Sequence, residues 1–208
     1  MSDLAATPPL VASYSGRLAL YGAAALVAAI ELFAGWQAIH PNVPDTYRAY
    51  FIDRTTTCLD QPVSGDYLFG TEISFSDGGP LIKPLRVCGW EGPVGNGLHA
   101  VGESSRLRFA LPATAHKLTL MVELSAVDMA KDGMPVELVA NGTTLGTVEV
   151  DPGTPQRFTL PIPDAALSAN HRLELEFRYP KAVQIDPQDS NTRKRSIKLS
   201  AGSITGQS

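Results

Sequence analysis

The stretch Val136–Val150, which reads VELVA-NG-TTLGTVEV, decides the fold of this chain. Two runs of strand-forming residues flank Asn141-Gly142, and both residues of this dipeptide tolerate the positive φ angles of a type I′ turn. The stretch therefore predicts a β-hairpin.

Outside this hairpin, apolar and polar residues alternate in several further segments. Such alternation is typical of strands with one face in a core and one face in solvent. The further strands are expected at Tyr67–Phe75, Leu85–Cys88, Leu107–Leu111, Leu118–Leu124, Arg157–Ile162, Leu173–Tyr179 and Ser196–Ile204. Eight or nine short strands without a helix predict an all-β domain, an antiparallel two-sheet β-sandwich of the jelly-roll kind.

In front of this domain, Leu18–Ile39 is apolar over 22 residues and carries one charge, Glu31. A run of this length and composition predicts one transmembrane α-helix. We therefore expect a cytoplasmic tail at 1–17, the helix at 18–39, a connector at 40–65 and an extracytoplasmic sandwich at 66–208.

A cleaved signal peptide is the alternative for this apolar run. A signal peptide has a positive n-region and a shorter apolar core, whereas here Arg17 is the one basic residue before the run. We favour an uncleaved anchor with its N-terminus in the cytoplasm, because Arg17 lies on that side.

Small and polar residues recur along this helix at intervals of three and four, which places them on one stripe. The stripe includes Tyr21, Ala24, Ala28, Glu31 and Gly35. Small residues let a second helix approach closely, and a carboxylate in a membrane span usually faces protein or water. The stripe predicts an interface with a partner helix. Alternatively, the alanines reflect ordinary composition and Glu31 reaches the membrane surface.

The two cysteines, Cys58 and Cys88, both follow the helix. An even number of cysteines beyond a membrane span predicts a disulfide in an oxidising compartment, with two buried thiols as the alternative. The net charge of −4 argues against a nucleic-acid surface.

The sequence carries no motif for a catalytic nucleophile, a zinc site, a P-loop or a dinucleotide. The four histidines are not spaced as metal ligands. We therefore expect no enzyme activity, no metal and no cofactor. A hydrolase would need two carboxylates facing each other across a cleft, which a sequence does not show.

Trp90, Glu91 and Asn96 are candidate glycan contacts, because sugar rings pack on aromatic faces and their hydroxyls bind polar side chains. The alternative for Trp90 is a core position beside Cys88.

Two groups of residues carry a resemblance to a known family. Gly89-Trp90-Glu91, Gly95, Gly97, Gly102 and Leu107–Pro112 form the first. The second comprises Asn141-Gly142, Pro161–Pro163, Leu173–Phe177 and Ser190-Asn191-Thr192-Arg193 with Ile197. Over 87–204 the pattern resembles jelly-roll domains attached to bacterial envelope glycosyltransferases and polysaccharide-assembly proteins. Leu98-His99 stands where such domains carry a second tryptophan, and Asn191-Thr192 where they carry an aspartate.

Two functions are consistent with these observations. The first is a non-enzymatic accessory subunit in the bacterial inner membrane, whose helix contacts integral membrane subunits and whose sandwich lies in the periplasm. The alternative is a glycan-binding module of an envelope polysaccharide system.

Overall fold

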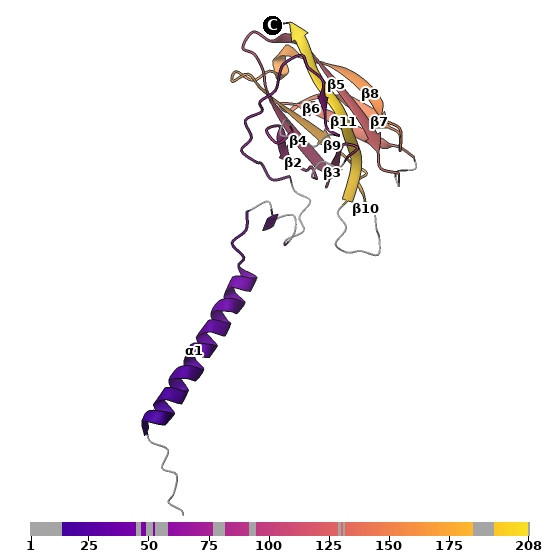
Figure 1. The fold of residues 1–208 in the computed structure, drawn as a ribbon. Helices are drawn as coiled ribbons and strands as arrows, with labels where there is room; N and C mark the ends of the chain where they lie inside the picture. The colour runs from indigo at the N-terminus through magenta and orange to yellow at the C-terminus, as the bar shows by residue number, and fades with distance from the viewer. Residues whose placement is uncertain are drawn as a thin grey trace, which may run out of the picture. The chain divides into compact units, whose positions relative to one another are not determined.

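The computed structural model describes residues 14–44, 47–48, 52, 58–76, 82–91, 95–128, 130, 132–184 and 194–207. The chain divides into two compact units, Met1–Asp45 and Thr46–Ser208. The first unit contains one helix, and the second is a β-sandwich (Figure 1).

Helix α1 spans Tyr14–Ile39, so it begins four residues before the expected start at Leu18 and ends where expected. Its segment Gly16–Ile39 has a mean hydropathy of 1.9, and none of it is buried within the structure. Length and composition make this segment a candidate membrane span, and a signal sequence has the same properties.

The strands of the second unit are mostly short. They are β1 (Ile73–Ser74), β2 (Arg86–Cys88), β3 (Leu98–Val101), β4 (Ser104–Ala110), β5 (His116–Ala126), β6 (Met134–Ala140), β7 (Thr143–Val150), β8 (Gln156–Ile162), β9 (Arg172–Arg178), β10 (Val183–Gln184) and β11 (Lys194–Gln207).

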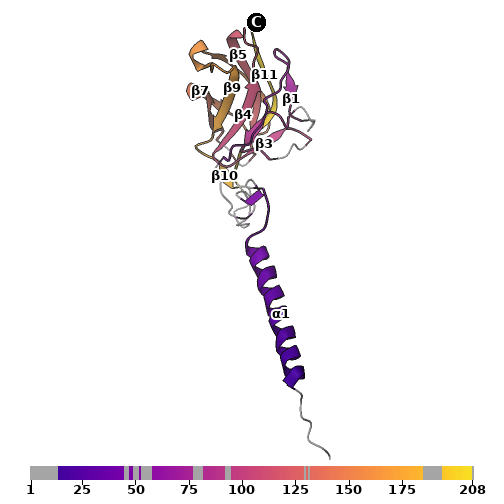
Figure 2. The same cartoon turned by 90° about the vertical axis from the view of Figure 1, so that its left-hand side faces the viewer.

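These strands form two sheets whose strand pairs are antiparallel. The first sheet has the order β1-β11-β5-β8, and β3 and β10 also pair with β11. The second has the order β2-β4-β9-β6-β7. Figures 1 and 2 show the two layers, with β11 running the length of the first sheet. The predicted all-β, jelly-roll-like sandwich is confirmed.

The hairpin at Asn141-Gly142 is confirmed, because β6 and β7 pair directly around it. Asn141 has φ of 45° and Gly142 has φ of 84°, as a type I′ turn requires. The Asn141 side chain also donates to the carbonyls of Ala166 (2.8 Å) and Arg172 (2.9 Å) and accepts from the Glu174 amide (2.9 Å). One turn residue therefore ties the hairpin to β9.

The strand predictions missed two strands and extended a third beyond its paired residues. β3 and β10 were not predicted, because each is too short for an alternating pattern. Only Ile73–Ser74 of the predicted strand Tyr67–Phe75 pairs in a sheet. The preceding residues are held by a side chain instead, since the Tyr67 hydroxyl bonds to the Thr71 carbonyl and to Ile204.

The core lies between the sheets and is built from the inward residues of both. Leu107 and Leu175 are direct neighbours on β4 and β9, and both are buried. Leu120 and Leu160 are the equivalent pair on β5 and β8. The polar partners in each alternating segment face outward, so the outer face of each sheet carries the charged side chains.

The disulfide between Cys58 and Cys88 is confirmed. It fixes the end of the connector to β2. Backbone hydrogen bonds from Gln61 to Val87 and from Gly65 to Pro84 extend the same attachment. The segment 58–65 of the expected connector therefore packs as part of the sandwich.

Candidate functional site

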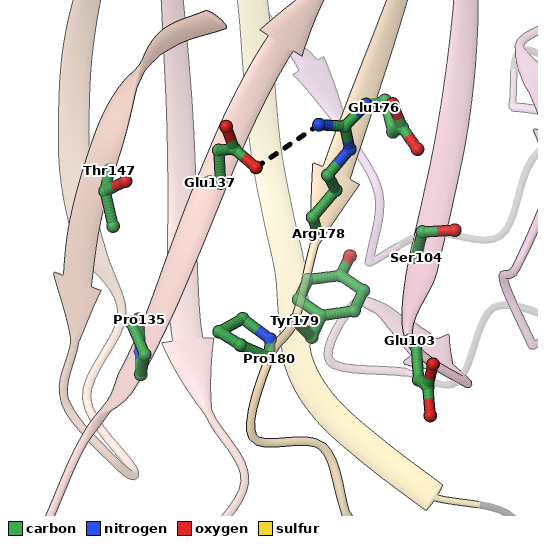
Figure 3. Close-up of a pocket in the computed structure, with 9 residues that line it drawn as sticks. All are labelled: Glu103, Ser104, Pro135, Glu137, Thr147, Glu176, Arg178, Tyr179 and Pro180. Atoms are coloured by element: carbon green, nitrogen blue, oxygen red, sulfur yellow. Dashed lines mark hydrogen bonds and ion pairs between the residues drawn. The ribbon is translucent and has the colours of Figure 1, made fainter.

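A groove lies on the outer face of the second sheet. Strand register places four side chains in one row across it, because Ser104 and Glu137 both pair with Arg178, and Glu137 also pairs with Thr147. The row crosses β4, β9, β6 and β7 in order, as Figure 3 shows. Four strands of one sheet therefore hold the centre of the groove in fixed positions.

The groove has a volume of about 710 Å³, which is within the range of small-molecule sites. Its other lining residues are Glu103, Pro135, Glu176, Tyr179 and Pro180. Figure 3 shows Pro135 on β6 and Pro180 on the segment that directly follows β9. Tyr179 is only 1% exposed, so its ring belongs to the core and offers no open face to a ligand.

Arg178 is held by two carboxylates in this groove. Its Nη2 donates to Glu176 (2.7 Å) and its Nη1 donates to Glu137 (3.3 Å). The hydrogen bond that Arg178 donates to Glu176 is the main reason why the pKa of Arg178 is raised. Glu137 also accepts a hydrogen bond from the Thr144 hydroxyl (3.0 Å). These bonds fix the direction of the polar groups before any ligand arrives.

Beyond the groove, the same sheet face carries a second charged cluster around Glu174. Arg106 and Arg108 donate to its two carboxylate oxygens at 3.0 and 2.7 Å. Arg106 also pairs with Asp60 at 2.7 Å. Burial raises the pKa of Glu174, but the hydrogen bonds from the two arginines outweigh burial and bring this pKa below its ordinary value.

Trp90, the first predicted glycan contact, is buried. It is 8% exposed, and its ring packs edge-on against Phe177 with the centroids 5.5 Å apart. Its indole nitrogen donates to the Arg106 carbonyl at 3.0 Å. Close packing next to it requires glycine, because a Cβ at Gly89 would lie 2.3 Å from the Ser104 carbonyl oxygen. The core alternative for Trp90 therefore fits the structure, and its ring is covered by the protein.

Glu91 and Asn96, the other two predicted glycan contacts, lie near β3. Glu91 forms an ion pair with Arg195, so its carboxylate already has a partner. Asn96 is exposed. Burial, and then the nearby charge of Arg195, lower the pKa of His99 beside them. The resemblance residues 190–193 lie outside the described part of the chain.

The predicted helix interface lies on α1. Tyr21, Ala24, Ala28, Glu31 and Gly35 are all exposed on this helix. A Cβ built on Gly35 meets nothing within 4 Å. The stripe therefore has room for a neighbour, and its partner remains a proposal.

Within the described residues, no group of three or more histidine, cysteine, aspartate or glutamate side chains is arranged to hold a metal ion.

The groove was not found from the sequence. Glu176 and Arg178 were recognised only as outward residues of a half-buried strand. Their alignment with Glu137 depends on the pairing of β6 with β9, two strands separated by more than thirty residues. The alternation of polar residues in both strands was the available signal, and it does not reveal register.

No family model and no curated protein matches this chain. Among solved structures, it is similar to the xylan-binding module CBM15, with 12% identity, a TM-score of 0.45 and coverage of 65% of this chain and 95% of that one. It is also similar to the CBM36-1 domain of a multidomain xylanase from the hindgut metagenome of Trinervitermes trinervoides. There the identity is 12%, the TM-score is 0.41 and the coverage is 66% and 98%. At this degree of overlap, the two likenesses carry no conclusion about a ligand.

Proposed function

We propose that this chain is a membrane-anchored, non-catalytic module that binds a glycan in the groove of its second sheet. The observation that carries the proposal is the row Ser104, Arg178, Glu137 and Thr147, which crosses four strands inside a groove of about 710 Å³.

A glycan matches this row chemically. Sugar hydroxyls both donate and accept hydrogen bonds, and the groove offers carboxylate acceptors, a guanidinium donor and two hydroxyls. Ion pairs hold Glu137, Glu176 and Arg178 in place, which lowers the entropic cost of ordering side chains on binding. Pro135 and Pro180 add apolar ring surface for the C–H faces of a sugar.

The state of the carboxylates argues for binding without catalysis. Glycoside hydrolysis uses one carboxylic acid to protonate the leaving oxygen and a second carboxylate as nucleophile or base. Glu137 and Glu176 both accept hydrogen bonds from Arg178. The two carboxylates share one guanidinium partner, and this pairing favours a binding role for them.

The anchor sets where such a module would work. A membrane-spanning α1 with Arg17 on the cytoplasmic side would place the sandwich outside the cytoplasm. The Cys58–Cys88 disulfide is consistent with that compartment, because disulfides persist where the environment is oxidising. In a bacterium, this compartment would be the periplasm at the inner membrane.

A glycan array probed with the full chain in mild detergent tests the proposal. The informative variant is Arg178→Ala, which removes the central guanidinium. Its matched control is Arg157→Ala, because Arg157 forms a similar pair of carboxylate bonds on the first sheet. We expect binding by the wild type and the control, and a loss of at least tenfold for Arg178→Ala. Equal binding by both variants, or no binding by the wild type, would overturn the proposal.

The stripe on α1 favours a second, compatible role as a subunit of a membrane assembly. Glu31 lies within the apolar segment Gly16–Ile39, where an unpaired carboxylate is costly. We propose that it faces a helix of an integral membrane protein that offers a hydrogen-bond donor at the same depth. A photo-crosslinker at Ala28 should then capture a protein, while one at Ile30, on another face of the helix, should not. Equal capture at both positions would count against this role.

A further inference from the structure

The groove carries an excess of negative charge. Glu103, Glu137 and Glu176 line it together with one cation, Arg178. Arg178 neutralises part of this charge through its two ion pairs. Glu103 is the most open of the three carboxylates, because its side chain is 68% exposed and its partner Lys194 lies 3.8 Å away. With Lys194 counted, the three carboxylates face two cations, so a ligand in the groove meets one net negative charge.

Resting on the proposed function, we infer that the groove selects glycans whose sugars carry amino groups and rejects glycans that carry carboxylates. The ammonium of an amino sugar gains attraction from Glu103 and places a donor where the lining offers acceptors. A uronate brings a like charge beside carboxylates whose cations are already paired, Arg178 with Glu137 and Glu176, and Lys194 with Glu103. We expect neutral sugars to bind with intermediate affinity, because they gain hydrogen bonds without electrostatic attraction or repulsion.

The distribution of charges on this sheet face confines the selection to the groove. The other charged cluster of this face pairs Arg106 and Arg108 with Glu174 and Asp60, so its charges balance. Of these two clusters, only the groove carries an excess of negative charge. A glycan chain that lies along the groove would contact negative charge at Glu103 and Glu137. This local charge acts independently of the small net charge of the whole protein.

The size of the effect follows from Coulomb's law. Two unit charges 4 Å apart interact by about 1 kcal/mol in water and about 4 kcal/mol at an effective dielectric constant near 20. The groove is open, so the lower figure governs, and replacing a uronate by an amino sugar reverses the sign of the interaction. We expect about a tenfold or greater preference at low salt, with most of it lost in 0.5 M NaCl.

The experiment measures binding of three hexasaccharides to the full chain in detergent. The probes are a glucosamine hexamer, an N-acetylglucosamine hexamer and a galacturonate hexamer. Glu103→Gln removes one groove charge and leaves both bonds of Arg178 intact. Its control is Glu72→Gln, the same change on the first sheet beside Arg157. We expect the amino hexamer to bind best, and Glu103→Gln to reduce its preference over the uronate several-fold, while Glu72→Gln leaves the preference unchanged.

Each outcome decides between the claims. If the galacturonate hexamer binds as well as the glucosamine hexamer, the inferred selection is wrong and glycan binding stands. If the preference is present but Glu103→Gln and Glu72→Gln affect it equally, the groove is not its source and the inference is overturned. If none of the three probes binds, and neutral glycans on the array also fail to bind, the proposed function fails and the inference fails with it.

Discussion

Cys58 and Cys88 are joined by a disulfide that closes a separation of 30 residues and attaches the segment that follows α1 to β2. The bond lies where the chain enters the sandwich, next to the ion pair between Asp60 and Arg106. The edge of the second sheet is thus the place where the connector is fixed to the domain that carries the groove.

Replacing both cysteines by serine should lower the free energy of unfolding of the sandwich by about 3–4 kcal/mol, since a closed loop of this length restricts the unfolded chain. Chemical denaturation of the full chain in detergent, followed by tryptophan fluorescence in a Trp36→Phe background so that Trp90 alone reports, measures the change. Reduction of the wild type with a thiol should produce the same loss. An unchanged denaturation midpoint for both the variant and the reduced protein would show that the disulfide is not a stabilising link.

Asn141 should be worth more to the fold than its place in an exposed turn suggests. Asn141→Gly keeps a residue that accepts positive φ but removes three side-chain hydrogen bonds to the backbone of residues 166–174. We expect a loss of about 2–3 kcal/mol in the free energy of unfolding, at about 1 kcal/mol for each bond. Gly142→Ala is the comparison, because it disturbs the same turn by strain alone. A loss below about 0.5 kcal/mol for Asn141→Gly, half of the value expected for a single bond, would contradict this expectation.

Glu174 should make stability depend on pH in the acidic range. Its pKa in the folded protein lies below its ordinary value of 4.5, so the stabilisation is present above pH 4.5 and is lost as the pH falls through the folded pKa. Wild type and Glu174→Gln should therefore differ in unfolding free energy at pH 6, and the difference should shrink as the pH falls below 4.5. Thermal melts at several pH values measure this gap. A gap that stays constant between pH 6 and pH 3 would exclude a role for the ionised carboxylate.

Trp90→Ala should destabilise the sandwich by about 3–5 kcal/mol, as truncation of a large buried aromatic side chain does. Trp90→Phe should be milder, because it keeps an aromatic contact to Phe177 while losing the bond to the Arg106 carbonyl. Folded Trp90→Phe protein should bind glycans as the wild type does, since the ring is covered. A variant that is as stable as the wild type and fails to bind would restore Trp90 as a ligand contact.

The part of the fold that depends on local pattern could be predicted from the sequence. Alternation found β4, β5 and β9, and Asn141-Gly142 located the β6–β7 turn, because each of these signals acts within a few residues. The stretch before β1 was predicted wrongly because Tyr67 replaces strand pairing with side-chain bonds to Ile204, which is distant in sequence.

The candidate site was harder to predict because it, too, depends on contacts between residues that are distant in sequence. Trp90 has the residue type of a sugar platform, and only its packing against Phe177 shows that it is covered. Glu137 and Arg178 look like ordinary solvent-facing residues until the pairing of β6 with β9 places them side by side. A surface site built across a sheet depends on register between distant strands, and composition does not encode that register.

Hydrogen–deuterium exchange of the full chain, with and without a glycan that binds it, tests the central claim most directly. Glycan binding in the groove should slow exchange in β6 and β9 around Glu137 and Arg178, with little change near Trp90 and Asn96. Protection confined to 89–99 and 194–199, with unchanged exchange in β6 and β9, would contradict it.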